Sequence, residues 1–236
     1  YITMTLNIAK SIVKLGNGIL KQTALPWTKE ELRDTTRLEK LLDTMVREMR
    51  SSSGCGIAAP QIGISKQLFL FELDARESDL KCPNFPLTAF FNPRIEIVDE
   101  DFVIPRPLAG SSKNLLNLTR FKRSVHSATN HLPRVATANN TISLWESCLS
   151  VPNFYGRVTR SRRCIISFTD IAGQSRAIEA DGIIAACLQH ENDHLHGRVY
   201  IERLKNGLND LVHIDEMSEE MLTDVQRLTG DFQITK

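Results

Sequence analysis

The residue pattern with the clearest chemistry is His190-Glu191-Asn192-Asp193-His194. On a helix, residues four apart lie on one face, so His190 and His194 could bind a single metal ion together. Glu191 would point to one side, where it could take a proton from a water activated by that ion without being a ligand itself. The pattern predicts a catalytic metal site, but it does not specify the reaction.

The residues around this pattern predict a buried helix. Asp181-Gly182 offers a start, the segment 183–188 is apolar nearly all round, and Gly197 offers a stop. Two histidines and a glutamate on a buried helix would be costly to leave unpaired, and a metal ion removes that cost.

A third ligand must come from elsewhere in the chain. A thiolate, two imidazoles and one open position make a workable catalytic site for Zn²⁺ or Fe²⁺, and Cys148 stands in a distinctive polar setting after Glu146. Taken alone, Cys148 also fits a small buried apolar residue. The downstream alternatives have no distinctive setting: Glu202, His213, Glu216, Glu219 and Glu220.

Three short motifs in order carry a resemblance to a known family. They are Gly54-Cys55-Gly56-Ile57-Ala58-Ala59-Pro60-Gln61, then Glu146-Ser147-Cys148-Leu149-Ser150, then Gln189-His190-Glu191-Asn192-Asp193-His194-Leu195. Together they resemble the peptide deformylases, over residues from about 25 to 204. The resemblance implies an α+β fold with mixed, mostly antiparallel sheets around a buried central helix that carries the His-Glu-x-x-His motif. It also implies one catalytic domain over residues 1–236, which removes the formyl group from the initiator methionine of nascent polypeptides and releases formate.

The resemblance assigns roles to individual residues. Cys148, His190 and His194 would hold one divalent metal ion, with Fe²⁺ as the natural ion and Zn²⁺, Ni²⁺ or Co²⁺ able to occupy the site in purified protein. Glu191 would transfer the proton, while the Gln61 amide and the Leu149 backbone N–H would stabilise the oxyanion. The residues expected to bind the N-formylmethionyl peptide are Cys55, Gly56, Glu146, Ser147 and Ala186.

The chain departs from the family pattern at three positions. Ser147 replaces a usual glycine, Cys55 occupies a position that is normally aliphatic, and Tyr155 falls where many bacterial members have an arginine. These changes bear on substrate affinity, and Cys55 is expected to make the site more sensitive to oxidation. They keep two alternatives open: a catalytically weak or inactive deformylase-like metal protein, and a metalloprotease that shares the His-Glu-x-x-His motif.

Composition agrees with one enzyme domain. The chain has 236 residues, a net charge of +1 and five cysteines, an odd number that favours a reducing compartment over a disulfide framework. No apolar run approaches the ~18 residues of a membrane span, so we expect no membrane association. The sequence does not indicate an oligomeric state.

Periodicity predicts the other elements. We expect a helix over 27–49 capped by Thr28, strands over 67–73 and 89–98, a hairpin of strands 163–170 and 175–180, and a terminal helix over 218–228. The basic run 157–163 is interpreted as an exposed strand edge, which charge protects from aggregation.

Residues 99–143 are interpreted as an insertion. From Phe102 to Trp145 there is no Asp or Glu, while six residues are Lys or Arg. This composition is typical of a solvated loop, and the alternative is a weak electrostatic contact with ribosomal RNA. The insertion and the length of the chain favour a mitochondrion or another organelle over the bacterial cytoplasm.

Overall fold

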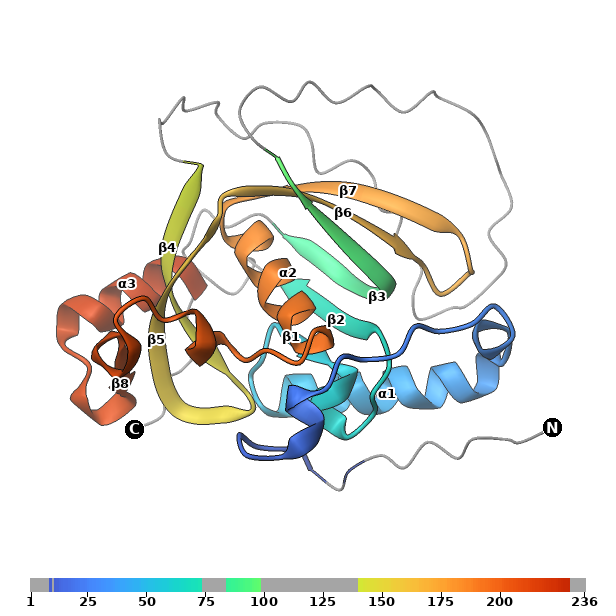
Figure 1. The fold of residues 1–236 in the computed structure, drawn as a ribbon, viewed down its shortest axis with the longest axis horizontal. Coiled ribbons are helices and arrows are strands. Elements are labelled where there is room, and N and C mark those ends of the chain that lie inside the picture. Colours follow the sequence, from blue (N-terminus) through green and yellow to red (C-terminus); the bar gives the residue numbers. More distant parts are fainter. Residues whose placement is uncertain (1–8, 10, 74–83, 99–139, 230–236) are drawn as a thin grey trace.

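A computed structural model describes residues 9, 11–73, 84–98 and 140–229. Figure 1 shows two antiparallel sheets with one helix between them. The larger sheet has the order β1-β2-β3-β6-β7 and the smaller has the order β4-β5-β8. Every pairing between these strands is antiparallel, and the predicted α+β class is confirmed.

The bounds of the elements follow the chain. The larger sheet contains β1 (Gly56–Ala58), β2 (Leu68–Leu73), β3 (Phe85–Ile97), β6 (Arg163–Thr169) and β7 (Ser175–Asp181). The smaller contains β4 (Thr141–Cys148), β5 (Val151–Ser161) and β8 (Leu211–His213). The α-helices are α1 (Thr35–Ser51), α2 (Gly182–Leu195) and α3 (Glu219–Thr229). Short 3₁₀ helices occupy Gly18–Lys21, Glu31–Arg33, Ala59–Ile62, Tyr200–Arg203, Gly207–Asp210 and Ile214–Glu216.

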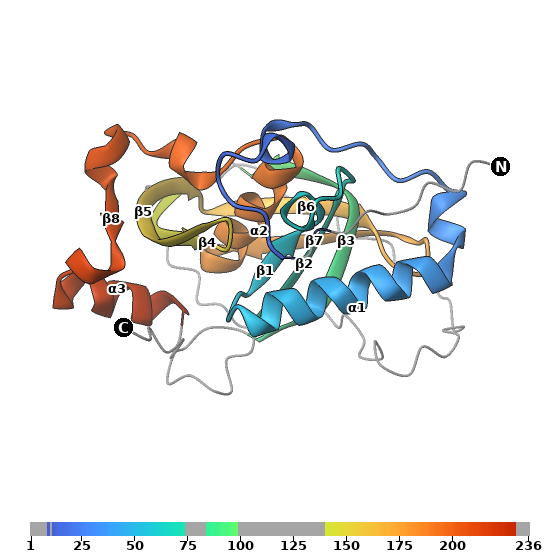
Figure 2. The ribbon, with the colours of Figure 1, turned by 90° about the horizontal axis from the view of Figure 1, so that it is seen from below.

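The larger sheet is apolar on both faces because a helix covers each one. Successive side chains of β2 point to opposite faces, so Leu68 and Leu70 pack in the cluster that includes α1, while Phe69 and Phe71 pack in the cluster that includes α2. Figure 2 shows α1 lying across the sheet on the side away from α2. Burial of each such side chain contributes about 1.5–3 kcal/mol. This packing fixes α2 against the sheet.

Helix α2 is buried, as its apolar sequence predicts. Ile184, Ala185 and Leu188 lie in the core between sheet and helix. The helix ends before Gly197, which has a φ of +69°, and a Cβ there would come within 2.7 Å of the Lys21 backbone. Only glycine meets both requirements, so the predicted stop is confirmed.

The first long helix begins later than periodicity predicts. Asp34 caps α1 by accepting a hydrogen bond from the Arg37 N–H, and the helix starts at Thr35 rather than near Trp27. Thr28 instead forms a reciprocal capping box with Glu31 at the short 3₁₀ helix Glu31–Arg33. Two capping signals occur within six residues, and the apolar period alone does not separate them.

The other predicted elements are confirmed with small differences at their ends. Strands β2 and β3, the β6–β7 hairpin and helix α3 lie where the sequence predicts them. The supposed insertion is one exception, since β4 already begins at Thr141. Residues 99–139 lie outside the described residues. None of the described helices is long and apolar enough to cross a membrane.

Candidate active site

Three potential metal ligands converge from two elements. Cys148 ends strand β4, while His190 and His194 lie one turn apart on helix α2. One donor atom from each residue lies within 4.8 Å of the other two, and the Cys148 Sγ is 3.3 Å from the His194 Nε2. All three side chains are buried. Cys148 is therefore the candidate for the third ligand. Glu202, one of the downstream alternatives, pairs instead with Lys21 and the Val199 N–H.

Cys148 and His190 act on each other electrostatically. Burial would lower the pKa of His190, but Cys148 and Glu146 raise it well above its ordinary range, so a bound cation must displace the imidazole proton. Burial would raise the pKa of Cys148, but the adjacent imidazoles of His194 and His190 lower it well below its ordinary range, which favours the thiolate. The His190 Nδ1 contacts the Glu146 carboxylate at 2.8 Å, which leaves the His190 Nε2 for the shared site. A thiolate with two imidazoles fits Zn²⁺ or Fe²⁺.

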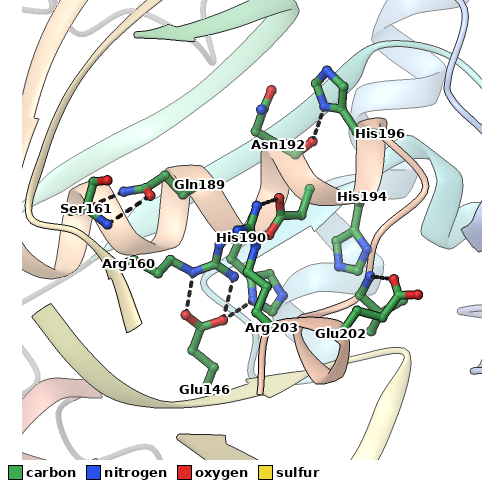
Figure 3. A network of polar contacts seen from close by, with 12 residues as sticks. Glu146, Arg160, Ser161, Gln189, His190, Asn192, His194, His196, Glu202 and Arg203 are labelled. Atoms are coloured by element: carbon green, nitrogen blue, oxygen red, sulfur yellow. Dashed lines mark hydrogen bonds and ion pairs between the residues drawn. The ribbon is translucent and has the colours of Figure 1, made fainter. Parts of the chain in front are cut away.

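A buried ionic network holds these ligands in place, as Figure 3 shows. Arg160 on β5 bonds both carboxylate oxygens of Glu146, at 2.5 and 2.8 Å, and reaches Asp193 on α2 at 2.8 Å. Arg203 bonds the same Asp193 from the other side. Burial would raise the pKa of Glu146, but Arg160 and His190 lower it to about 2. The carboxylate that orients His190 is therefore ionised.

Two residues of this network, Arg160 and Glu146, have surroundings that the sequence did not predict. The prediction that 157–163 forms an exposed edge is wrong for Arg160, which is 3% exposed. Its neighbour two positions earlier, Val158, is fully buried, so the inward face of β5 contained a signal for a buried arginine. The carboxylate of Glu146 is engaged by Arg160 and His190, so its side chain orients a potential metal ligand, while the contact of Glu146 with substrate stays a prediction.

Glu191 has the surroundings of a proton-transfer group. Its side chain lines the cavity beside the ligands, and within the described residues its Oε2 is buried without a hydrogen-bond partner. Burial is the largest influence and raises the pKa of Glu191 well above its ordinary range. A carboxylate whose pKa is raised in a cleft is suited to accept and return a proton near neutral pH.

The Gln61 amide is fixed with its NH₂ group toward the ligands. Its Oε1 accepts a hydrogen bond from the Ala58 N–H at 2.8 Å, while its Nε2 donates to the Ser150 hydroxyl at 3.2 Å and lies 3.5 Å from the Cys148 Sγ. Leu149 lies between Cys148 and Ser150 in the turn from β4 to β5, and its carbonyl accepts a hydrogen bond from Lys14. Gln61 and Leu149 thus come from two separate segments, the 3₁₀ helix Ala59–Ile62 and the turn between β4 and β5.

A cavity of about 460 Å³ opens beside these groups. Its lining includes every residue that was expected to bind substrate: Cys55, Gly56, Glu146, Ser147 and Ala186. Two of the departures from the family pattern also meet here, because Ser147 and Tyr155 both line this cavity. Burial raises the pKa of Tyr155, and the Ser147 side chain opposes that change.

A comparison with protein families supports the same interpretation of this site. The family model described as "Polypeptide deformylase" matches residues 9–209. The chain belongs to the polypeptide deformylase family. This deformylase is a hydrolase, and its reaction removes the N-formyl group from nascent polypeptides.

Named relatives resemble the deformylase along most of its length. Peptide deformylase 2 of Bordetella bronchiseptica is 33% identical over 196 residues, which are 83% of this chain and 88% of that protein. Peptide deformylase 2 of Prochlorococcus marinus is 31% identical over 192 residues, which are 80% of this chain and 71% of that protein. The range matched by the family model, residues 9–209, includes all three motifs.

Solved structures share the fold of the deformylase. A Met-Ala-Ser-bound peptide deformylase from Acinetobacter baumannii has a TM-score of 0.60 and 26% identity, covering 84% of this chain and 99% of that one. A peptide deformylase from Synechococcus elongatus in complex with actinonin has a TM-score of 0.59 and 24% identity, covering 99% and 92%. At that identity the second structure supports the fold alone.

Proposed function

We propose that Cys148, His190 and His194 hold one divalent metal ion, Fe²⁺ in the native protein, and that Glu191 transfers the proton during deformylation. The convergence of three buried donor atoms within 4.8 Å carries this proposal. When bound, such an ion polarises the formyl carbonyl and lowers the pKa of a water toward roughly 7. The remaining chemistry belongs to side chains of this protein.

Glu191 serves as the base and then as the acid. Its buried carboxylate takes a proton from the attacking water as oxygen adds to the formyl carbon. The C–N bond then breaks, and Glu191 returns the proton to the leaving nitrogen. The products are formate and a peptide with a free N-terminal methionine, so one water is consumed for each formyl group.

Gln61 and Leu149 stabilise the oxyanion that develops on the formyl oxygen. The Gln61 NH₂ group is aimed at the site by the Ala58 N–H, which holds the amide oxygen on the other side. We assign the second donor to the Leu149 backbone N–H, since Leu149 follows Cys148 and lines the same cavity. Loss of one such donor costs ~10²–10³ in rate.

The substrate backbone is proposed to run along strand β1. This strand lies at the edge of the larger sheet and is paired with β2 on one side. Its first residue, Gly56, lines the cavity, so an N-formylmethionyl peptide could add as a further strand there. Ser147, Tyr155 and Ala186 would contact the substrate from the other walls.

The decisive experiment replaces Glu191 with Gln and measures formate release from a formyl-Met peptide together with bound metal. We expect a loss of ~10²–10⁴ in kcat with metal content unchanged. Glu202→Gln is the control, because Glu202 is a partly exposed acid that pairs with Lys21 outside the site. Full activity in Glu191→Gln, or internal peptide cleavage without formate, would overturn the proposal and favour a metalloprotease.

The identity of the metal requires a separate experiment. Zn²⁺ outcompetes Fe²⁺ for such ligands at equilibrium, so purification in air favours the wrong ion. Anaerobic purification, with elemental analysis and activity measured on the same fractions, should give activity in proportion to iron content. Activity that follows zinc instead would contradict the assignment of Fe²⁺.

We also propose a weak ribosome contact through the basic segment 99–143, most of which lies outside the described residues. Its support is the absence of acidic residues from Phe102 to Trp145. Deletion of residues 104–140 should reduce ribosome co-sedimentation at low salt, and unchanged sedimentation would exclude the contact. The location in a mitochondrion or another organelle remains a proposal that fractionation of the source cell would test.

A further inference from the structure

Two cysteines that are not metal ligands lie together in the wall of the substrate cavity. Cys55 immediately precedes β1, and Cys187 lies on α2. Both are free and partly buried, both line the cavity, and both pack against the same apolar cluster. The Cys187 thiol is the largest influence on the pKa of Cys55, which it lowers. A pair of adjacent thiols is therefore open to reagents that enter the cavity.

A second observation shows that the two segments touch at an adjacent point. Gly56 follows Cys55, and Glu191 lies one helical turn beyond Cys187 on the same face of α2. A Cβ built on Gly56 would come within 2.3 Å of the Glu191 Oε1. The chain at 55–56 and the turn at 187–191 are thus in close contact at two successive positions.

We propose that Cys55 and Cys187 form a disulfide when the protein meets a peroxide, and that this bond reversibly inactivates the enzyme. The cross-link itself depends only on the two thiols. Its effect on activity rests on the proposed function, because the loss arises at the cavity where Glu191 acts.

The chemistry balances with hydrogen peroxide as the oxidant. The Cys55 thiolate attacks one peroxide oxygen, the O–O bond breaks, and Cys55 becomes a sulfenic acid as the first water leaves. The Cys187 sulfur then attacks the Cys55 sulfur, and the hydroxyl leaves as the second water. Two thiols and one peroxide give one disulfide and two waters. The adjacent Cys187 thiol lowers the pKa of Cys55, which favours Cys55 as the thiol that attacks first.

The Cys55–Cys187 disulfide would inactivate the enzyme by shifting the contact between Gly56 and Glu191. A disulfide draws the start of β1 toward α2, where Gly56 already contacts the Glu191 carboxylate. Any shift in this contact displaces the proton-transfer group relative to the metal ligands. A displacement of ~1 Å at a catalytic group can reduce the rate by about 10²-fold.

The test uses the full-length protein loaded with Zn²⁺, because this ion has no redox chemistry of its own. The protein is treated with stoichiometric hydrogen peroxide, and the remaining thiols are alkylated. Peptide mass spectrometry then identifies any linked pair, and formate release is measured before treatment, after treatment, and after dithiothreitol. We expect a Cys55–Cys187 linked peptide and a loss of activity that dithiothreitol reverses.

Matched variants separate this pair from other thiols. Cys55→Ala and Cys187→Ala, each compared with its own untreated activity, should lose the linked peptide and the reversible inactivation. Cys164→Ala is the control and should behave like the parent, because Cys164 is buried in β6 and burial raises its pKa to about 12.

Each result has a defined meaning. Oxidation of Cys55 without a link to Cys187, or reversible inactivation that persists in both variants, would overturn the proposal. A quantitative cross-link without loss of activity would also overturn it as a switch. If the reduced protein showed no deformylation, the proposed function would fail, while the mass of the linked peptide would still decide whether the disulfide forms.

Discussion

At the scale of single residues, the close contact between Gly56 and Glu191 constrains the position of the proposed proton-transfer group. Glu191 is buried, and the backbone of Gly56 approaches it so closely that no side chain fits between them. The glycine is required here for close approach. Because Gly56 has no Cβ, the start of β1, where we propose that substrate binds, can lie directly against the Glu191 carboxylate.

We predict that Gly56→Ala reduces kcat by about 10²-fold, because the new Cβ must displace the Glu191 carboxylate. Steady-state formate release, with circular dichroism to verify folding, measures this effect. Gly54→Ala is the matched control and should cost far less, since its Cβ would approach the flexible end of the Leu149 side chain at 3.0 Å and the Gly56 carbonyl oxygen at 3.4 Å, an ordinary contact distance. Equal losses in the two variants would contradict the assigned role of this contact.

At the scale of elements, Arg160 joins three segments that are distant in sequence. It extends from β5 to Glu146 on β4 and to Asp193 on α2, and Arg203 of the 3₁₀ helix Tyr200–Arg203 bonds the same aspartate. Glu146 in turn fixes His190. The smaller sheet and the central helix are thus held in register by a buried network whose charges satisfy one another.

We predict that Arg160→Ala destabilises the protein by about 3–5 kcal/mol, because the carboxylates of Glu146 and Asp193 each lose their most deeply buried cationic partner. Arg203→Ala should cost less than about 1 kcal/mol, since its side chain is 36% exposed and solvent screens the pair. Urea denaturation of the metal-free proteins measures both values. Similar midpoints for the two variants would show that burial of Arg160 does not determine its contribution.

A second element-scale prediction concerns pH. Glu31 accepts a hydrogen bond from the Thr28 N–H and pairs with Lys66, whose side chain is only 14% exposed. Burial would raise the pKa of Glu31, but Lys66 and Thr28 lower it below its ordinary value of 4.5. The ionised form therefore favours the folded state. This contribution is complete above pH 4.5 and is lost as the pH falls through the lower pKa of the folded state.

The parent should accordingly be more stable than Glu31→Gln at pH 7, and the difference should shrink as the pH falls below 4.5. Thermal denaturation of both proteins between pH 7 and pH 3 measures this difference. Glu30→Gln serves as the control, because Glu30 is an exposed neighbour. A stability difference that does not change with pH would contradict the assigned ion pair.

At the scale of the whole molecule, the proposed metal site joins the two sheets. Cys148 belongs to the smaller sheet, while both histidines lie on α2, which packs against the larger one. Figure 1 shows the helix between the two layers. A metal ion bound at this junction would stabilise the folded chain by the free energy of its binding, since the unfolded chain has no preformed site.

We predict that metal at 100 times its dissociation constant stabilises the protein by about 2.7 kcal/mol relative to the metal-free form. Calorimetry with and without a chelator measures the corresponding rise in Tm. Cys148→Ala should show a much smaller rise, because one of the three ligands is lost. An equal rise in this variant would place the stabilising metal elsewhere.

Local patterns in the sequence determined much of this protein. The spacing of His190 and His194 reflects the period of an α-helix, and the apolar run before them predicts that the helix is buried. Segments rich in Phe and Ile predicted β2 and β3, and alternating apolar residues predicted the β6–β7 hairpin. The three short motifs also contain Gly56, Gln61, Cys148 and Glu191, which all line the cavity. These features depend on neighbours close in the chain.

Only the tertiary structure decided which distant groups share an environment. It placed the Cys148 sulfur beside the His194 imidazole, buried Arg160 between Glu146 and Asp193, and brought Cys55 against Cys187. Side-chain burial and pKa depend on the packing of strands and helices that are far apart in sequence. A local period gives the inward face of β5, but it does not indicate that two carboxylates from other elements lie there to receive an arginine.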